Sequence, residues 1–130
     1  QALSTFKFRN DVKLTGYIPR EDLVKLIGSA YALVYPSLWE GFGMPVLEAM
    51  QSGVPVLCSG SSALPEIAGD AALYFDPLKP EEIGQQLAHV YKDEQARSLM
   101  IERGLARAAS FSWTKSCLQV REILQDAASR

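Results

Sequence analysis

The chain has 130 residues, of which 48% are hydrophobic and 22% are charged. These proportions are typical of one globular domain and exclude a disordered tail. The 15 acidic and 13 basic residues leave a formal net charge of −2, which disfavours nucleic-acid binding because that function needs a basic surface. No apolar run approaches the length of about 18 residues that predicts a membrane-spanning helix.

The first third of the chain alternates between strand and helix patterns. Residues 12–17 (VKLTGY) predict a strand. Residues 21–29 predict a helix, since their apolar side chains recur at helical spacing. Residues 32–35 (ALVY) form a short apolar run, which is typical of a parallel strand covered on both faces.

The middle of the chain continues this alternation. A glycine-rich turn leads to a predicted helix over 45–52, with a proline in its first turn. Residues 55–58 (PVLC) predict the next strand. We expect Ser62 to cap a short helix that ends near Ala68, and 72–75 (ALYF) to form the fourth strand.

The final third predicts only helices. They cover 80–92 and 94–109, and a last helix begins after Ser112, a residue suited to the N-cap. One stripe of this last helix holds Trp113, Cys117, Val120, Leu124 and Ala127. Strands alternating with helices predict an α/β protein of Rossmann type, with a parallel sheet core, flanking helices and a helical C-terminal third.

The residues that usually bind metals or form disulfides are few. Cys58 and Cys117 both lie in apolar stretches, which favours reduced core residues over a disulfide between them. His89 falls on a predicted helix, where a structural or solvent-facing role is favoured over catalysis. No Asp-any-Asp pair is present, so we predict no metal site.

The turn after residues 32–35 is the segment best suited to chemistry, because ligands of such sheets bind beyond the carboxyl ends of the strands. Gly41 and Gly43 allow a sharp turn, and the helix after them begins with unpaired N–H groups that attract anions. Glu40 and Glu48 flank the turn, and their carboxylates can accept hydrogen bonds from sugar hydroxyls. The other interpretation is a tight turn with two glutamates near a helix N-terminus.

These residues carry a resemblance to a known family. The stretch from Glu40 to Glu48 (EGFGMPVLE) resembles the signature of the retaining group-one glycosyltransferases, family four, which have the GT-B fold. The resemblance covers about residues 11–128. Further segments in the family's order are Thr15–Tyr17, Tyr35–Ser37, Glu48–Met50, Gly53–Val56, Leu64–Glu66 and Phe111–Trp113.

The resemblance implies a role for each residue of the turn. Glu40 corresponds to the catalytic acid that contacts the transferred sugar, and Glu48 to the acid that holds the ribose hydroxyls. Ile18 corresponds to a backbone position beside the nucleotide base. The positions that meet the sugar and the diphosphate through their backbone are Gly41, Phe42, Gly43, Met44 and Val46.

The resemblance also implies the reaction. The family transfers a sugar from a nucleotide-sugar donor to an acceptor with retention of configuration, and it generally needs neither metal nor cofactor. We expect a cytoplasmic enzyme because of the donor supply and the reduced cysteines, with peripheral membrane contact left open. One alternative is a non-catalytic nucleotide-sugar-binding or interaction module. The other is a nucleotide-sugar epimerase of the same architecture, and the Glu-Gly-Phe-Gly turn disfavours this epimerase.

Parts of the family pattern are absent from this sequence. The family places an Arg and a Lys for the diphosphate in an earlier strand–helix unit, and it places the acceptor site in an N-terminal domain. We therefore expect residues 1–130 to be one domain fragment, the donor-binding domain without its first strand–helix units, and to be inactive alone.

This expectation has a consequence for the sheet. Residues 32–35, 54–58 and 72–75 should form a three-stranded parallel core. The strand at 12–17 would have to pair with 32–35, pair with another chain, or lose its order. The exposed sheet edge could support self-association, because unpaired backbone groups accept an added strand.

Five other features carry expectations of their own. The loop 59–62 is expected to cap a helix rather than to border the donor site. Glu66 is expected to have a structural role near the site, and Trp113 to pack the last helix. Trp39 lies at the mouth of the site, where stacking on a sugar stays open. The last feature is the pair of tyrosines at 31 and 35, both expected in the core.

Overall fold

A three-stranded parallel sheet forms the centre of the molecule in the computed structural model, which describes residues 7–129. The strands are β1 (Leu33–Tyr35), β2 (Val56–Ser59) and β3 (Ala72–Phe75), in the spatial order β1-β2-β3. Both neighbouring pairs are parallel. This confirms the expected three-stranded core and the α/β fold class.

Helices follow each strand and fill the C-terminal third, as the sequence predicts. Their bounds lie within a residue or two of the expected ones, and Ser112 accepts a hydrogen bond from the Lys115 N–H as the expected N-cap of the last helix. The α-helices are α1 (Arg20–Gly28), α2 (Met44–Gln51), α3 (Leu64–Ala68), α4 (Pro80–Lys92), α5 (Glu94–Ala109) and α6 (Trp113–Ala128). Within residues 7–129, short 3-10 turns are η2 (Arg9–Asp11) and η3 (Gly69–Ala71).

The hydrophobic core lies on both faces of the sheet. All four residues of β2 are buried, which explains why its sequence shows a continuous apolar run and no alternation. Val56 and Cys58 face the cluster that α2 and α3 complete. Leu57 faces the opposite cluster, which contains Val90 of α4 and Met100 of α5.

Helix α5 approaches α2 closely because of one glycine. Gly104 is buried, and a Cβ atom at this position would lie 3.4 Å from Met50 Cγ. The glycine weakens the intrinsic preference of this segment for helix, but it allows the two helices to pack together. Tertiary packing therefore outweighs the local cost.

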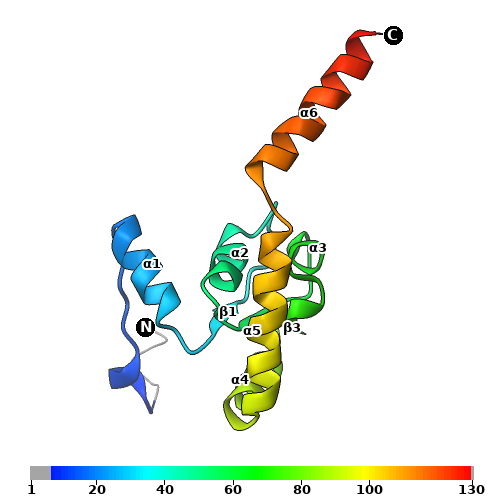
Figure 1. Cartoon of the computed structure of the whole chain (residues 1–130). Coiled ribbons are helices and arrows are strands. Elements are labelled where there is room, and N and C mark those ends of the chain that lie inside the picture. The colour runs from blue at the N-terminus through cyan, green and yellow to red at the C-terminus, as the bar shows by residue number, and fades with distance from the viewer. Residues whose placement is uncertain (1–6, 130) are drawn as a thin grey trace.

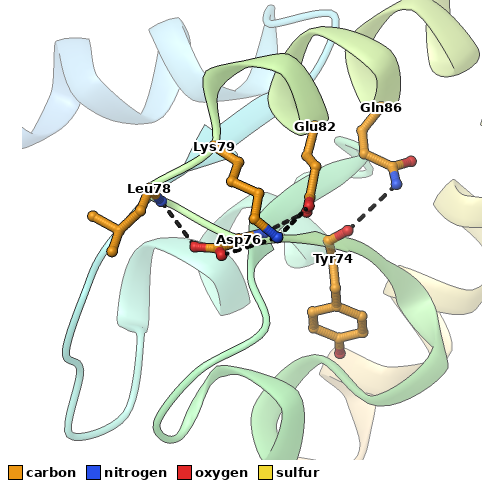
Figure 2. A network of polar contacts seen from close by, with 6 residues as sticks. All are labelled: Tyr74, Asp76, Leu78, Lys79, Glu82 and Gln86. Carbon is orange, nitrogen blue, oxygen red and sulfur yellow. Dashed lines mark hydrogen bonds and ion pairs between the residues drawn. The ribbon is translucent and has the colours of Figure 1, made fainter.

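The turn between β3 and α4 is held by a polar network (Figure 2). Lys79 Nζ lies 3.4 Å from an Asp76 carboxylate oxygen and 3.0 Å from Glu82 Oε1. The Leu78 N–H donates to Asp76, and this bond is the main cause of the lowered pKa of the Asp76 carboxyl. The Asp76 N–H in turn donates to Glu82 and lowers the pKa of that carboxyl. The network fixes the start of α4.

The predicted strand at 12–17 is wrong, because these residues form no strand. Val12, Leu14 and Tyr17 are exposed, Tyr17 at 97%. Gly16 has a φ of +60°, outside the extended region that a strand needs. Of the outcomes considered for this segment, pairing with 32–35 is excluded and the strand order is lost, so β1 lies at the edge of the described sheet.

The last helix has the expected bounds but not the expected packing. Figure 1 shows α6 projecting away from the sheet and the other helices. No residue of α6 is buried, and Trp113 is 81% exposed, so its expected packing role is wrong. Cys117 is also exposed, contrary to the core position expected for it, whereas Cys58 is buried. Tyr31 is 47% exposed and therefore not a core residue, while Tyr35 is half-buried.

Candidate functional site

The turn between β1 and α2 depends on a glycine in the left-handed region. Gly43 has a φ of +92°, a conformation that side-chain-bearing residues rarely adopt. A Cβ atom here would also overlap Leu64 Cδ2, and Leu64 is fully buried. Gly41 differs, since a Cβ atom there would meet nothing within 4 Å. Of the two glycines in the motif, Gly43 is therefore the one that the backbone requires.

The backbone N–H groups of this turn fall into two sets. Those of Phe42, Gly43 and Met44 donate to no other atom of the described residues. The N–H groups of Val46 and Leu47 both donate to the Gly43 carbonyl oxygen, at 3.0 and 3.4 Å. The Val46 amide, expected to meet the donor, is thus already paired inside the first turn of α2.

Glu40 is held at the end of β1 by its side chain and by its backbone. The Tyr35 phenol donates to Glu40 Oε1 at 2.5 Å. Ser37 Oγ lies 3.3 Å from the same oxygen and 3.1 Å from the Trp39 carbonyl oxygen, so its single proton is shared between these two acceptors. The Glu40 N–H donates to Ser62 Oγ at 3.0 Å. The hydrogen bond to Glu40 is the largest cause, followed by burial, of the rise in the pKa of Tyr35 to about 12.

The loop 59–62 borders the turn, contrary to its expected role. Ser59 is fully buried and donates to the Ser37 carbonyl oxygen at 2.5 Å. Ser61 reaches the Leu38 carbonyl oxygen at 3.4 Å. Ser62 has a φ of +55° and does not cap α3, whose N-cap is Ala63. The hydroxyls of this loop are instead bonded to residues 37–40, and the serine-rich stretch after β2 was the signal for this in the sequence.

A cleft of about 1090 Å³ lies beside the turn. Glu48 lines it together with Phe42 and Met44, which are 39% and 44% exposed. Phe42 packs edge-on against Phe111, with 5.9 Å between the ring centroids. Residues from α1, α2, α5 and α6 complete the walls.

Basic side chains also line this cleft, and sequence reasoning did not single them out. They are Arg20, Arg107 and Lys115. Arg107 is committed to the fold, because its guanidinium donates to the carbonyl oxygens of Glu66 and Ile67, and it lies 5.0 Å from the Phe111 ring centroid. A cleft with a carboxylate and several cations can accept a ligand that carries both hydroxyls and negative charge.

The structure brings together some of the expected site residues and separates others. Phe42, Met44 and Glu48 share the cleft, whereas Glu40 is not among its lining residues. Ile18 precedes α1 and is half-buried, but it does not line the cleft either. Trp39 is 82% exposed beside Glu40.

Two properties concern metals and membranes. Within residues 7–129, no three His, Cys, Asp or Glu side chains form a cluster that could hold a metal ion. No helix in the same range is long and apolar enough to cross a membrane.

The buried cysteine of β2 is a weak acid. Burial raises the pKa of the Cys58 thiol to about 12, so this cysteine is protonated at neutral pH.

A family model matches most of the chain. Residues 3–107 match the model of the family described as Glycosyl transferases group 1. The chain therefore belongs to the group 1 glycosyltransferases.

Similar proteins include several bacterial mannosyltransferases. O-antigen chain mannosyltransferase B from Escherichia coli is 44% identical over 108 residues, which are 83% of this chain and 28% of the relative. Mannosylfructose-phosphate synthase from Agrobacterium fabrum is 28% identical over 128 residues, which are 96% of this chain and 28% of that protein. The chain thus spans less than a third of the length of these relatives.

A solved structure has the same fold. Sucrose-phosphate synthase from Thermosynechococcus elongatus superposes with a TM-score of 0.81 at 24% identity, over 92% of this chain and 31% of that one. An identity this low shows the fold alone. Together with the family, it confirms the expected GT-B fold class.

Proposed function

We propose that this chain is the donor-binding part of a retaining glycosyltransferase, which moves a sugar from a nucleotide-sugar to an acceptor. The observation that carries the proposal is the turn from Glu40 to Glu48. It combines amide groups that are unpaired within the described residues with a carboxylate on each side. A nucleoside diphosphate sugar offers the complementary groups, which are phosphate oxygens and vicinal hydroxyls.

In this proposal, each part of the turn meets a different part of the donor. The amides of Phe42, Gly43 and Met44, at the N-terminus of α2, offset the charge that develops on the departing diphosphate. Glu48 accepts hydrogen bonds from the ribose hydroxyls within the cleft. Glu40 accepts hydrogen bonds from the transferred sugar and holds its anomeric carbon in place for transfer.

We further propose that the transferred sugar is mannose, which the names of the E. coli and A. fabrum relatives support. The acceptor-binding part would lie outside this chain, since the chain covers 28% of those relatives. On this proposal residues 1–130 bind the donor but do not turn it over alone.

The test is an amide-resolved NMR titration of the chain with GDP, UDP and ADP. We expect shifts to cluster at residues 41–48 for one base, and Glu48→Ala to weaken that binding about tenfold or more, since hydrogen bonds to charged groups contribute about 1.5–3 kcal/mol. Glu102→Ala is the matched control, because Glu102 is an exposed helical glutamate on α5 outside the cleft.

Two results would contradict parts of the proposal. If no nucleotide shifts residues 41–48, the turn is not a donor site. If the natural-length protein binds a nucleotide-sugar but releases no nucleoside diphosphate from it, the chain belongs to a binding module and not to an enzyme.

A further inference from the structure

We propose that Tyr35 is a positioning residue for Glu40, whose phenol fixes one carboxylate oxygen so that the other is presented to the sugar of the donor. This inference rests on the proposed function, because it needs Glu40 to contact that sugar. Tyr35 itself is assigned no contact with the donor.

The hydrogen bonds around Glu40 converge on a single oxygen. Tyr35 Oη donates to Oε1 at 2.5 Å. Ser37 Oγ lies 3.3 Å from the same oxygen, but its single proton is shared with the Trp39 carbonyl oxygen at 3.1 Å. Oε2 accepts no hydrogen bond from the residues that the structure describes. A carboxylate held in this way has one oxygen for the protein and one for a ligand hydroxyl.

The position of Tyr35 in the sheet makes it suited to this task. It is the last residue of β1, and in the parallel register it lies opposite Cys58, which lies opposite Tyr74. Its ring packs against the buried cluster that contains Cys58. A tyrosine side chain has two torsion angles, and packing restricts both, so the phenol can hold a carboxylate at little entropic cost.

The backbone of Glu40 is fixed independently of the phenol. Its N–H donates to Ser62 Oγ, and loop 59–62 also holds the carbonyl oxygens of Ser37 and Leu38. Because the main chain is held in this way, loss of the phenol should release the carboxylate without unfolding the turn. With a pKa of about 12, the Tyr35 phenol is protonated at neutral pH and is therefore a donor.

Tyr74 offers a matched control within the same sheet. It lies on the same face as Tyr35, it is half-buried, and its phenol also donates one hydrogen bond of 2.5 Å. The acceptor, however, is the Gly69 carbonyl oxygen and not a side chain of the turn. Tyr74→Phe and Tyr35→Phe thus each remove one phenol oxygen and one hydrogen bond, but only Tyr35→Phe affects Glu40.

The test compares these two variants in the natural-length protein with GDP-mannose and UDP-glucose as probes. For the probe that the wild type uses, we expect Tyr35→Phe to lower kcat for nucleoside diphosphate release about tenfold to a hundredfold, the effect of losing a hydrogen bond to a charged group. The Kd for GDP or UDP alone should change by less than about twofold, since Tyr35 holds only the carboxylate that meets the sugar. Tyr74→Phe should leave both quantities unchanged.

Three results overturn the inference, and they differ in what they say about the proposed function. If Tyr35→Phe retains the wild-type kcat, the positioning role is wrong while the enzyme remains. If the variant loses affinity for the nucleoside diphosphate as strongly as it loses kcat, the phenol supports the whole turn and not the orientation of Glu40. If the wild type releases nucleoside diphosphate from neither probe, the proposed transfer of mannose fails, and the role of Tyr35 in that transfer fails with it.

Discussion

Replacement of Gly43 by alanine tests whether the turn at the site is built as the structure indicates. The backbone at Gly43 has a φ of +92°, where an added Cβ is strained, and that Cβ would overlap Leu64 Cδ2. Leu64 is fully buried, so its side chain has little room to move away. Both effects act on the folded state, and Gly43→Ala should therefore lower the free energy of unfolding.

The size of the effect follows from these two contributions. A left-handed conformation costs a residue with a side chain about 1–2 kcal/mol. Overpacking of a filled core costs about 1–3 kcal/mol. A sum of about 2–5 kcal/mol is a large part of the total stability of about 5–15 kcal/mol that is typical of natural domains. We therefore expect Gly43→Ala to lower Tm by about 10 °C or more.

The assay is urea unfolding followed by circular dichroism, with Gly41→Ala as the control. A Cβ at Gly41 meets nothing within 4 Å, and its φ lies outside the left-handed region, so this change should stay within about 0.5 kcal/mol of the wild type. A double variant, Gly43→Ala with Leu64→Val, should recover part of the loss because it removes a clashing methyl group. Equal stability of the two alanine variants would refute the reasoning.

Two further predictions concern the cysteines and are checked on the same protein. Ellman's reagent should modify one thiol quickly in the folded chain, because Cys117 is exposed and Cys58 is buried, and Cys117→Ser should abolish the fast phase; two fast thiols would contradict this. Burial raises the pKa of the Cys58 thiol from 9.0 to about 12 in the folded state. The unfolded state therefore loses this proton at lower pH, and the free energy of unfolding should fall as the pH rises from about 9 to 12. Cys58→Ala should make that decline shallower in urea unfolding measured across this range, and an unchanged slope would count against the assigned cause.

Local patterns predicted the order of the elements well. The apolar runs at 32–35, 55–58 and 72–75 became the three strands, because a run that is apolar at every position can be buried only between two layers. The spacing of apolar residues and the proline near the N-terminus of α2 located the helices in the same way. The turn between Glu40 and Glu48 could also be predicted from the sequence, because the need for glycine in a sharp turn is a local property of the backbone.

Errors arose where a prediction needed a partner that lies far away in the sequence. The 12–17 segment has the composition of a strand, but among residues 7–129 no strand lies beside it to pair with, and its apolar side chains remain exposed. The stripe on α6 has helical periodicity, yet periodicity does not state what the stripe packs against. Cys58 and Cys117 lie in similar apolar stretches, but only Cys58 lies in the sheet.

The sequence by itself therefore determined the class of the fold, the turn and the two glutamates that define the candidate donor site. The tertiary structure alone showed how Glu40 is held, since its partners are a phenol at the end of β1 and a serine 22 residues further along the chain. It also placed Glu48 in the cleft and left Glu40 outside it. The physical reason is that hydrogen-bond geometry depends on where the chain brings distant side chains together, and no local pattern contains that information.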